Sequence, residues 1–175
     1  MKRRLLFISM ILAVMLVTLM PATALAAKPT SFNASGTITY ISPGTVFPAG
    51  KSDRWVVAER ELTGSLSGDI SGDFTMTYKA NVESVQTQAG NLHGRLEVSP
   101  YVLEVNGELQ PAEFVGWFAP GIPLYQGIFN GRWTFTQGAR GNGDFDACVI
   151  FVPTPEGHVG YIVDGDFTMS GQWQP

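Results

Sequence analysis

The chain has little of three things: cysteine, charge and helical periodicity. Cys148 is the only cysteine among 175 residues, so no internal disulfide can form and stability must come from packing. It lies in an apolar run, 147–151, which predicts a buried and inert thiol. Charged residues make up 15% of the chain, and beyond residue 26 no window has the 3.6-residue hydrophobic period of an amphipathic helix. Fold classes built on helices are therefore excluded.

The sequence also lacks a recognisable catalytic set. It has two histidines, His93 on the polar side of an alternating segment and His158 in a turn-rich segment, and both are expected in solvent. It contains no Gly-x-Ser-x-Gly elbow, no His-Glu-x-x-His pair and no phosphate-binding glycine loop. We therefore assign no catalytic residue, no metal ligand and no cofactor, and whether the protein is an enzyme stays open.

Residues 1–26 have the pattern of a secretory signal peptide. Lys2, Arg3 and Arg4 precede an apolar run, and the small-x-small site of 24–26 predicts cleavage near Ala26. We expect an exported protein, periplasmic or extracellular, with a single domain over 27–175 and no membrane span once the signal is removed. Because the signal carries three positive charges and no acid, the chain total of −4 becomes −7 for that domain. This acidity argues against a nucleic-acid partner, which requires a basic surface.

The rest of the chain alternates between apolar and polar residues, and the clearest case is 74–83. Phe74, Met76 and Tyr78 point to one side, while the residues between them are polar. A period of two over this length predicts a β-strand with one face on a core and the other in water. The five residues Gly-Asp-Phe-Thr-Met that begin this strand at Gly72 recur from Gly165. Similar segments are expected at 32–41, 54–67, 92–99, 101–109, 113–118, 127–137, 144–152 and 159–173.

Strands that follow one another at short intervals predict an all-β, antiparallel fold. A closed barrel of about eight strands is favoured because closure removes exposed strand edges, and a β-sandwich is the alternative. The segment 119–124, with two prolines and a glycine, is expected to be a loop. The pair Asn142-Gly143 suits the turn of a tight hairpin.

One motif resembles a known family. Gly64-x-Leu66-x-Gly68, followed by Gly72-x-Phe74, is similar to the glycine signature of small allene oxide cyclase-like barrels, relatives of the dirigent proteins. The resemblance implies an eight-stranded antiparallel barrel with an apolar lumen. It further implies binding of a hydrophobic small molecule, or steering of its cyclisation. No catalytic residue of the family matches a position in this chain.

Aromatic residues are the best candidates for a ligand site. Those that fall in expected strands and serve as candidate ligand-binding residues are Tyr78, Trp117, Trp133, Phe135 and Trp173. Glu59 is added as a carboxylate that would have a raised pKa if it pointed into the lumen. Its direction is open, because four consecutive apolar residues, 55–58, leave the strand's phase unsettled.

Three functions remain. The favoured one is binding of a hydrophobic small molecule in the lumen, since eight-stranded barrels hold either packed side chains or one small ligand. The first alternative is a cell-surface interaction or carbohydrate-binding module, for which outward-facing tryptophans would provide a platform. The second is a cyclase-like enzyme acting on a hydrophobic substrate. Homo-oligomerisation is open in each case.

Overall fold

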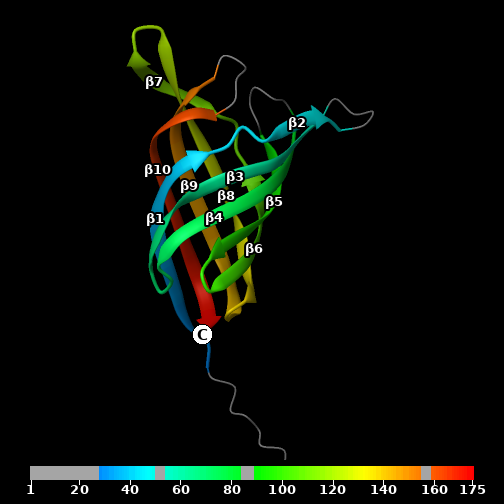
Figure 1. The fold of residues 1–175 in the computed structure, drawn as a ribbon, viewed down its shortest axis with the longest axis vertical. Coiled ribbons are helices and arrows are strands. Elements are labelled where there is room, and N and C mark those ends of the chain that lie inside the picture. Colours follow the sequence, from blue (N-terminus) through cyan, green and yellow to red (C-terminus); the bar gives the residue numbers. More distant parts are fainter. Residues whose placement is uncertain (1–27, 50–53, 84–88, 155–158) are drawn as a thin grey trace, which may run out of the picture.

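The computed structural model describes residues 28–49, 54–83, 89–154 and 159–175 (Figure 1). The predicted signal peptide, 1–26, lies outside these residues. The described residues form ten strands and no helix, so none of them belongs to a helix able to cross a bilayer. The strands are β1 (Thr30–Ile41), β2 (Thr45–Pro48), β3 (Trp55–Gly68), β4 (Gly72–Val82), β5 (Gly90–Val98), β6 (Tyr101–Leu109), β7 (Glu113–Ala119), β8 (Ile122–Gln137), β9 (Arg140–Pro153) and β10 (Val159–Gln174).

Eight of these strands form a closed ring. The sheet runs β1-β10-β9-β8-β6-β5-β4-β3, and β3 pairs back with β1, every pairing being antiparallel. The predicted closed barrel of eight strands is confirmed. Strands β2 and β7 lie outside the ring, where β2 pairs with β3 and β7 pairs with β8. Closure leaves the ring without a free edge.

Strand alternation divides the wall into an apolar inside and a polar outside. On β4, Phe74, Met76 and Tyr78 are buried, whereas Thr77 and Lys79 are exposed. The repeated segment on β10 behaves in the same way, with Phe167 and Met169 buried. The core is therefore the lumen of the barrel.

Aromatic rings fill the lumen from the end where β1 begins and β10 ends, drawn at the bottom of Figure 1. In the lowest layer of rings, Phe32 packs against Trp133 with the ring centroids 4.7 Å apart. Phe135 and Trp173 belong to the same layer, and their two rings stack on each other at 6.1 Å. A middle tier stacks Phe167 between two further phenylalanines. These are Phe74, at 5.4 Å, and Phe145, at 5.9 Å.

Two glycines make room for the largest of these rings. An added Cβ at Gly143 would lie 2.7 Å from Cζ2 of Trp133, and one at Gly171 would lie 2.8 Å from the same atom. Gly143 and Gly171 are paired across β9 and β10, so together they form a flat patch beneath the indole. The expected turn at Asn142-Gly143 is wrong: both residues lie inside β9, and the chain turns at 138–139, where Gly138 has φ +87°.

The expected loop over 119–124 is also wrong in its extent. The chain reverses over Pro120 and Gly121 alone, and β8 resumes at Ile122. Proline followed by a glycine at φ +79° is the combination that a type II turn favours. The result is a β7–β8 hairpin that projects beyond the barrel, seen at the top of Figure 1.

Candidate functional site: a cavity at the hairpin end of the barrel

Above the aromatic tiers the lumen is hollow. A cavity of about 360 Å³ lies at the end of the barrel from which the β7–β8 hairpin projects. Most of its wall is apolar, and Arg60 is the one charged group among the described residues that line it. The other lining residues are Leu109, Gln110, Ala112, Tyr125, Gly127, Ile128, Phe129, Val149, Phe151, Pro153, Thr154 and Val159.

A bulge in β3 turns Arg60 inward. The pairing of β3 with β4 shifts register between Val57 and Arg60, and Glu59 adopts φ 55°, a left-handed conformation that few non-glycine residues take. The shift reverses the phase of the strand. Val57 is buried, Glu59 is exposed, and Arg60 is buried with 2% of its surface exposed. The bulge thus places a guanidinium where strict alternation from Val57 would place a carboxylate.

The segment before β2 anchors this arginine. Nε and Nη2 of Arg60 donate to the carbonyl oxygen of Pro43 at 3.3 Å and 2.9 Å. Ser42 and Glu61 fix the segment on β3, because the Ser42 amide donates to the Glu61 carbonyl and the Glu61 amide donates to Ser42 Oγ. Gly44 allows close approach: it has φ +65°, and an added Cβ would lie 2.8 Å from the Ala58 carbonyl oxygen.

Tyr78 is the cross-strand partner of Arg60 on the inner face of β4. Its hydroxyl is buried and makes no hydrogen bond of standard geometry to the described residues, yet the guanidinium of Arg60 lies close enough to act on it both by its charge and as a hydrogen-bond donor. Burial raises the pKa of the Tyr78 phenol above its ordinary value of 10.0, and the positive charge of Arg60 offsets part of this rise. The ring packs against Phe129, one of the residues of the cavity wall, at 6.1 Å.

This pKa shift predicts a loss of stability at alkaline pH. Below pH 10 the phenol is protonated in both the folded and unfolded chains. Above pH 10 the unfolded chain releases its proton first, so the free energy of unfolding falls by up to about 1.4 kcal/mol per pH unit until the raised pKa is passed. Tyr78→Phe should remove this component, measured by urea unfolding from pH 8 to 11. Tyr40→Phe, at an exposed phenol, is the matched control, and an unchanged alkaline decline in Tyr78→Phe would contradict the assignment.

The structure separates the residues that the sequence put forward as ligand-binding. Trp133, Phe135 and Trp173 lie together at the end of the barrel opposite the cavity, where Phe135 packs against both tryptophans. Tyr78 points into the lumen beside the cavity wall. Trp117 lies outside the ring on β7 with 62% of its surface exposed.

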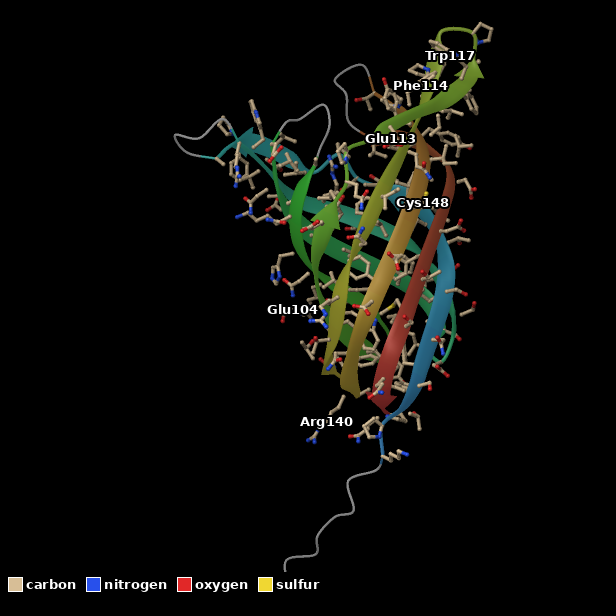
Figure 2. All side chains as sticks on the ribbon, turned by 180° about the vertical axis from the view of Figure 1, so that it is seen from behind. Glu104, Glu113, Phe114, Trp117, Arg140 and Cys148 are labelled. Atoms are coloured by element: carbon tan, nitrogen blue, oxygen red, sulfur yellow. The ribbon has the colours of Figure 1, made fainter. Side chains whose placement is uncertain are left out.

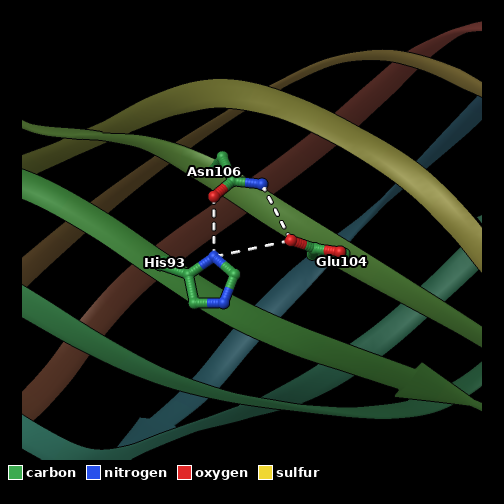
Figure 3. A network of polar contacts seen from close by, with 3 residues as sticks. All are labelled: His93, Glu104 and Asn106. Atoms are coloured by element: carbon green, nitrogen blue, oxygen red, sulfur yellow. Dashed lines mark hydrogen bonds and ion pairs between the residues drawn. The ribbon is translucent and has the colours of Figure 1, made fainter.

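Glu59 also lies outside the lumen, since the bulge turns it to solvent. It lines a shallow depression on the outer wall, with His93 and Glu104 among its neighbours. Figure 3 shows the polar contacts there: His93 Nδ1 lies 2.6 Å from Asn106 Oδ1, and Asn106 Nδ2 donates to Glu104 Oε1 at 3.5 Å. The His93 side chain is 65% exposed, as predicted for the polar face of its strand, and the Glu104 side chain is 49% exposed. His158 lies outside the described residues.

Cys148 is half-buried, so the prediction of a buried thiol needs correction. Within β9 the inward positions are Ala147 and Val149, which leaves Cys148 on the outer face between β8 and β10. There its sulfur accepts a hydrogen bond from Gln126 Nε2 at 2.9 Å. Across the residues that the structure describes, no group of three histidine, cysteine or acidic side chains is placed to hold a metal ion.

Arg60 is the residue that sequence reasoning missed. Its neighbours in the sequence, Glu59 and Glu61, are charged, and a run of three charged residues suggests a solvated face. The available signal was the unsettled phase of 55–58: an apolar run that breaks alternation is where a bulge is expected.

Comparisons of the chain with models of known protein families, with curated proteins and with solved structures found no match. The likeness to allene oxide cyclase-like barrels therefore stays a prediction that depends on Gly64, Leu66, Gly68, Gly72 and Phe74.

Proposed function

We propose that this protein binds a small, largely apolar molecule in the hollow end of its barrel. The observation that carries the proposal is the cavity itself. Its volume of about 360 Å³ falls within the range of roughly 300–1,000 Å³ that is typical of small-molecule sites. Burying an apolar ligand against such a wall is favourable by about 25 cal/mol per Å² of apolar surface.

Arg60 gives the proposed ligand a second property. A guanidinium in an apolar wall attracts an anionic or strongly accepting group more strongly than it would in water, because the local dielectric is low. The ligand that fits this wall best is an apolar body with one acidic or hydrogen-bond-accepting end. Turnover of such a ligand, the cyclase-like alternative, stays a prediction.

Filling the cavity tests the proposal. An added Cβ at Gly127 would meet only side-chain atoms at ordinary contact distances, the nearest being Val149 Cγ2 at 3.4 Å, so Gly127→Leu should be accepted. The leucine would occupy space that the ligand needs. Burial of one methylene group contributes about 0.8 kcal/mol. If the leucine displaces two methylene groups of the ligand from the cavity, binding should weaken about tenfold or more.

The measurement uses N-phenyl-1-naphthylamine, an uncharged apolar probe whose fluorescence rises on burial. We expect saturable binding to the unaltered protein and weaker binding to Gly127→Leu, with thermal unfolding unchanged or raised. Thr134→Leu adds the same side chain at an exposed position of β8 and is the matched control. No saturable binding to the unaltered protein, or equal binding to Gly127→Leu, would overturn the cavity as a ligand site.

A further inference from the structure

The β7–β8 hairpin carries the largest group of exposed apolar side chains on the described chain. Figure 2 shows Phe114 and Trp117 on the hairpin beyond the end of the barrel, with Glu113 at its base. Phe114 is 52% exposed, Trp117 is 62% exposed, and the neighbouring Phe118 is 54% exposed. Val115 and Ile122 are also more than two-fifths exposed. Exposed apolar groups of this size typically mark a surface that contacts a partner, either another protein or a membrane.

Two properties define that partner. First, consecutive residues of β7 are exposed, so the hairpin presents apolar side chains on both faces and not on one. Second, the twelve residues 114–125 contain no charged side chain. A protein surface docking on a strand pair covers one face, whereas a lipid layer surrounds the whole projection.

We propose that this hairpin inserts into the interfacial layer of a lipid bilayer with neutral headgroups. Tryptophan and tyrosine favour that layer, and an inserted apolar element is buried there by about 5–10 Å. The four steps from Phe114 to Phe118 extend about 13 Å at roughly 3.3 Å per residue, which suffices for this depth without spanning the bilayer. The hairpin contacts a membrane without crossing it.

Charge selects neutral over anionic lipid. The chain beyond residue 26 has a formal net charge of −7, and Glu113 at the base of the hairpin is exposed. An acidic body is repelled by an anionic surface, so attraction must come from burial of apolar side chains. Pro120 at the turn and Pro123 in β8 also suit insertion, because neither has an amide hydrogen to leave unpaired in a layer poor in water.

The hairpin base belongs to the cavity wall. Ala112 and Tyr125, which flank the hairpin, both line the cavity. Insertion would therefore bring the hollow end of the barrel to the bilayer, where apolar molecules accumulate. This last step rests on the proposed binding function, whereas membrane contact does not.

The test is flotation with vesicles of phosphatidylcholine, part of it carrying brominated acyl chains that quench tryptophan fluorescence on contact. The unaltered protein should float with the vesicles, and its fluorescence should be quenched. Trp117→Ser combined with Phe118→Ser should lower the bound fraction at least about tenfold. Phe47→Ser, which removes an exposed phenylalanine of β2, is the matched control and should float normally. Trp117→Phe should float but lose most of the quenching.

Three outcomes would overturn the proposal. The first is that the unaltered protein stays unbound. The second is binding that requires anionic lipid and is abolished by salt. The third is self-association in the absence of lipid that the Trp117→Ser, Phe118→Ser variant abolishes, which would make a second copy of the chain the partner. Gly127→Leu separates the two proposals, because its filled cavity should leave flotation unchanged even if no ligand binds.

Discussion

Replacing Trp133 with alanine is expected to lower the free energy of unfolding by about 3–5 kcal/mol, the cost of deleting a fully buried large aromatic side chain. The indole has no exposed surface and packs on Phe32 and Phe135, with ring centroids 4.7 Å and 5.2 Å away. Its Nε1 also donates to the Asp144 carbonyl oxygen at 3.0 Å. The gap cannot close easily, because Gly143 has no side chain to move into it and the closed ring resists inward collapse.

The measurement is urea unfolding followed by circular dichroism in the β region, which does not depend on the deleted chromophore. Trp117→Ala is the matched control: the same change at an exposed ring should alter the free energy of unfolding by no more than about 0.5 kcal/mol. The loss of unfolding free energy in Trp133→Phe should lie between those of Trp133→Ala and Trp117→Ala, since phenylalanine keeps part of the ring but loses the hydrogen bond. A loss below about 1 kcal/mol in Trp133→Ala would show that the aromatic tier does not hold the barrel end together.

The sequence predicted the barrel because its strongest signal is also what determines the fold. Alternation of period two at Phe74 to Val82 required one buried face, and the only way to bury every such face without an open edge was closure. Strand β4 begins and ends close to the predicted segment. The alternation of apolar and polar residues was therefore sufficient to predict a strand wherever that alternation was regular.

Turns were harder to predict, because a glycine has more than one use. Asn142-Gly143 matches a hairpin turn, yet Gly143 is needed where Trp133 lies flat against the strand. That requirement comes from a residue on the neighbouring strand β8, so no local pattern reveals it. The turn fell at Gly138 instead, where φ is +87°.

The candidate site was predicted only in outline. An aromatic residue on an inward face looks the same in sequence whether it fills the lumen or borders a hollow. Trp133 and Phe135 fill it, whereas Phe129 and Phe151 border the cavity. What decides between these roles is the position of the side chain along the barrel axis. That position depends on how far each strand is displaced along its neighbour.

The inward direction of Arg60 could not be predicted from the sequence, because one bulge reverses which residues of the following strand face the lumen. With uninterrupted alternation from Val57, Glu59 would point inward and Arg60 outward, and the lumen would hold a negative charge. The observed shift between Val57 and Arg60 inverts this sign. The sign of the charge determines which class of ligand the cavity favours.

Arg60→Met is therefore expected to change ligand selectivity more than affinity for apolar molecules. The probe 1-anilinonaphthalene-8-sulfonate has the naphthylamine body of the uncharged probe with an added sulfonate. A hydrogen bond to a charged group contributes about 1.5–3 kcal/mol, so the substitution should weaken sulfonate binding by about 10- to 100-fold. The uncharged probe, which needs only the apolar wall, should bind within about threefold of its affinity for the unaltered protein.

The uncharged probe also serves as the folding control, since Arg60→Met removes the two hydrogen bonds that the Pro43 carbonyl now accepts from the guanidinium. Retained binding of that probe shows that the cavity survives this loss. Arg60→Lys keeps the charge and loses the planar, two-donor geometry, so its sulfonate affinity should lie between those of the unaltered protein and Arg60→Met. Equal weakening of both probes would mean that Arg60 shapes the wall and does not select for charge. In that case the acidic end of the proposed ligand would have no partner, while the apolar cavity would remain.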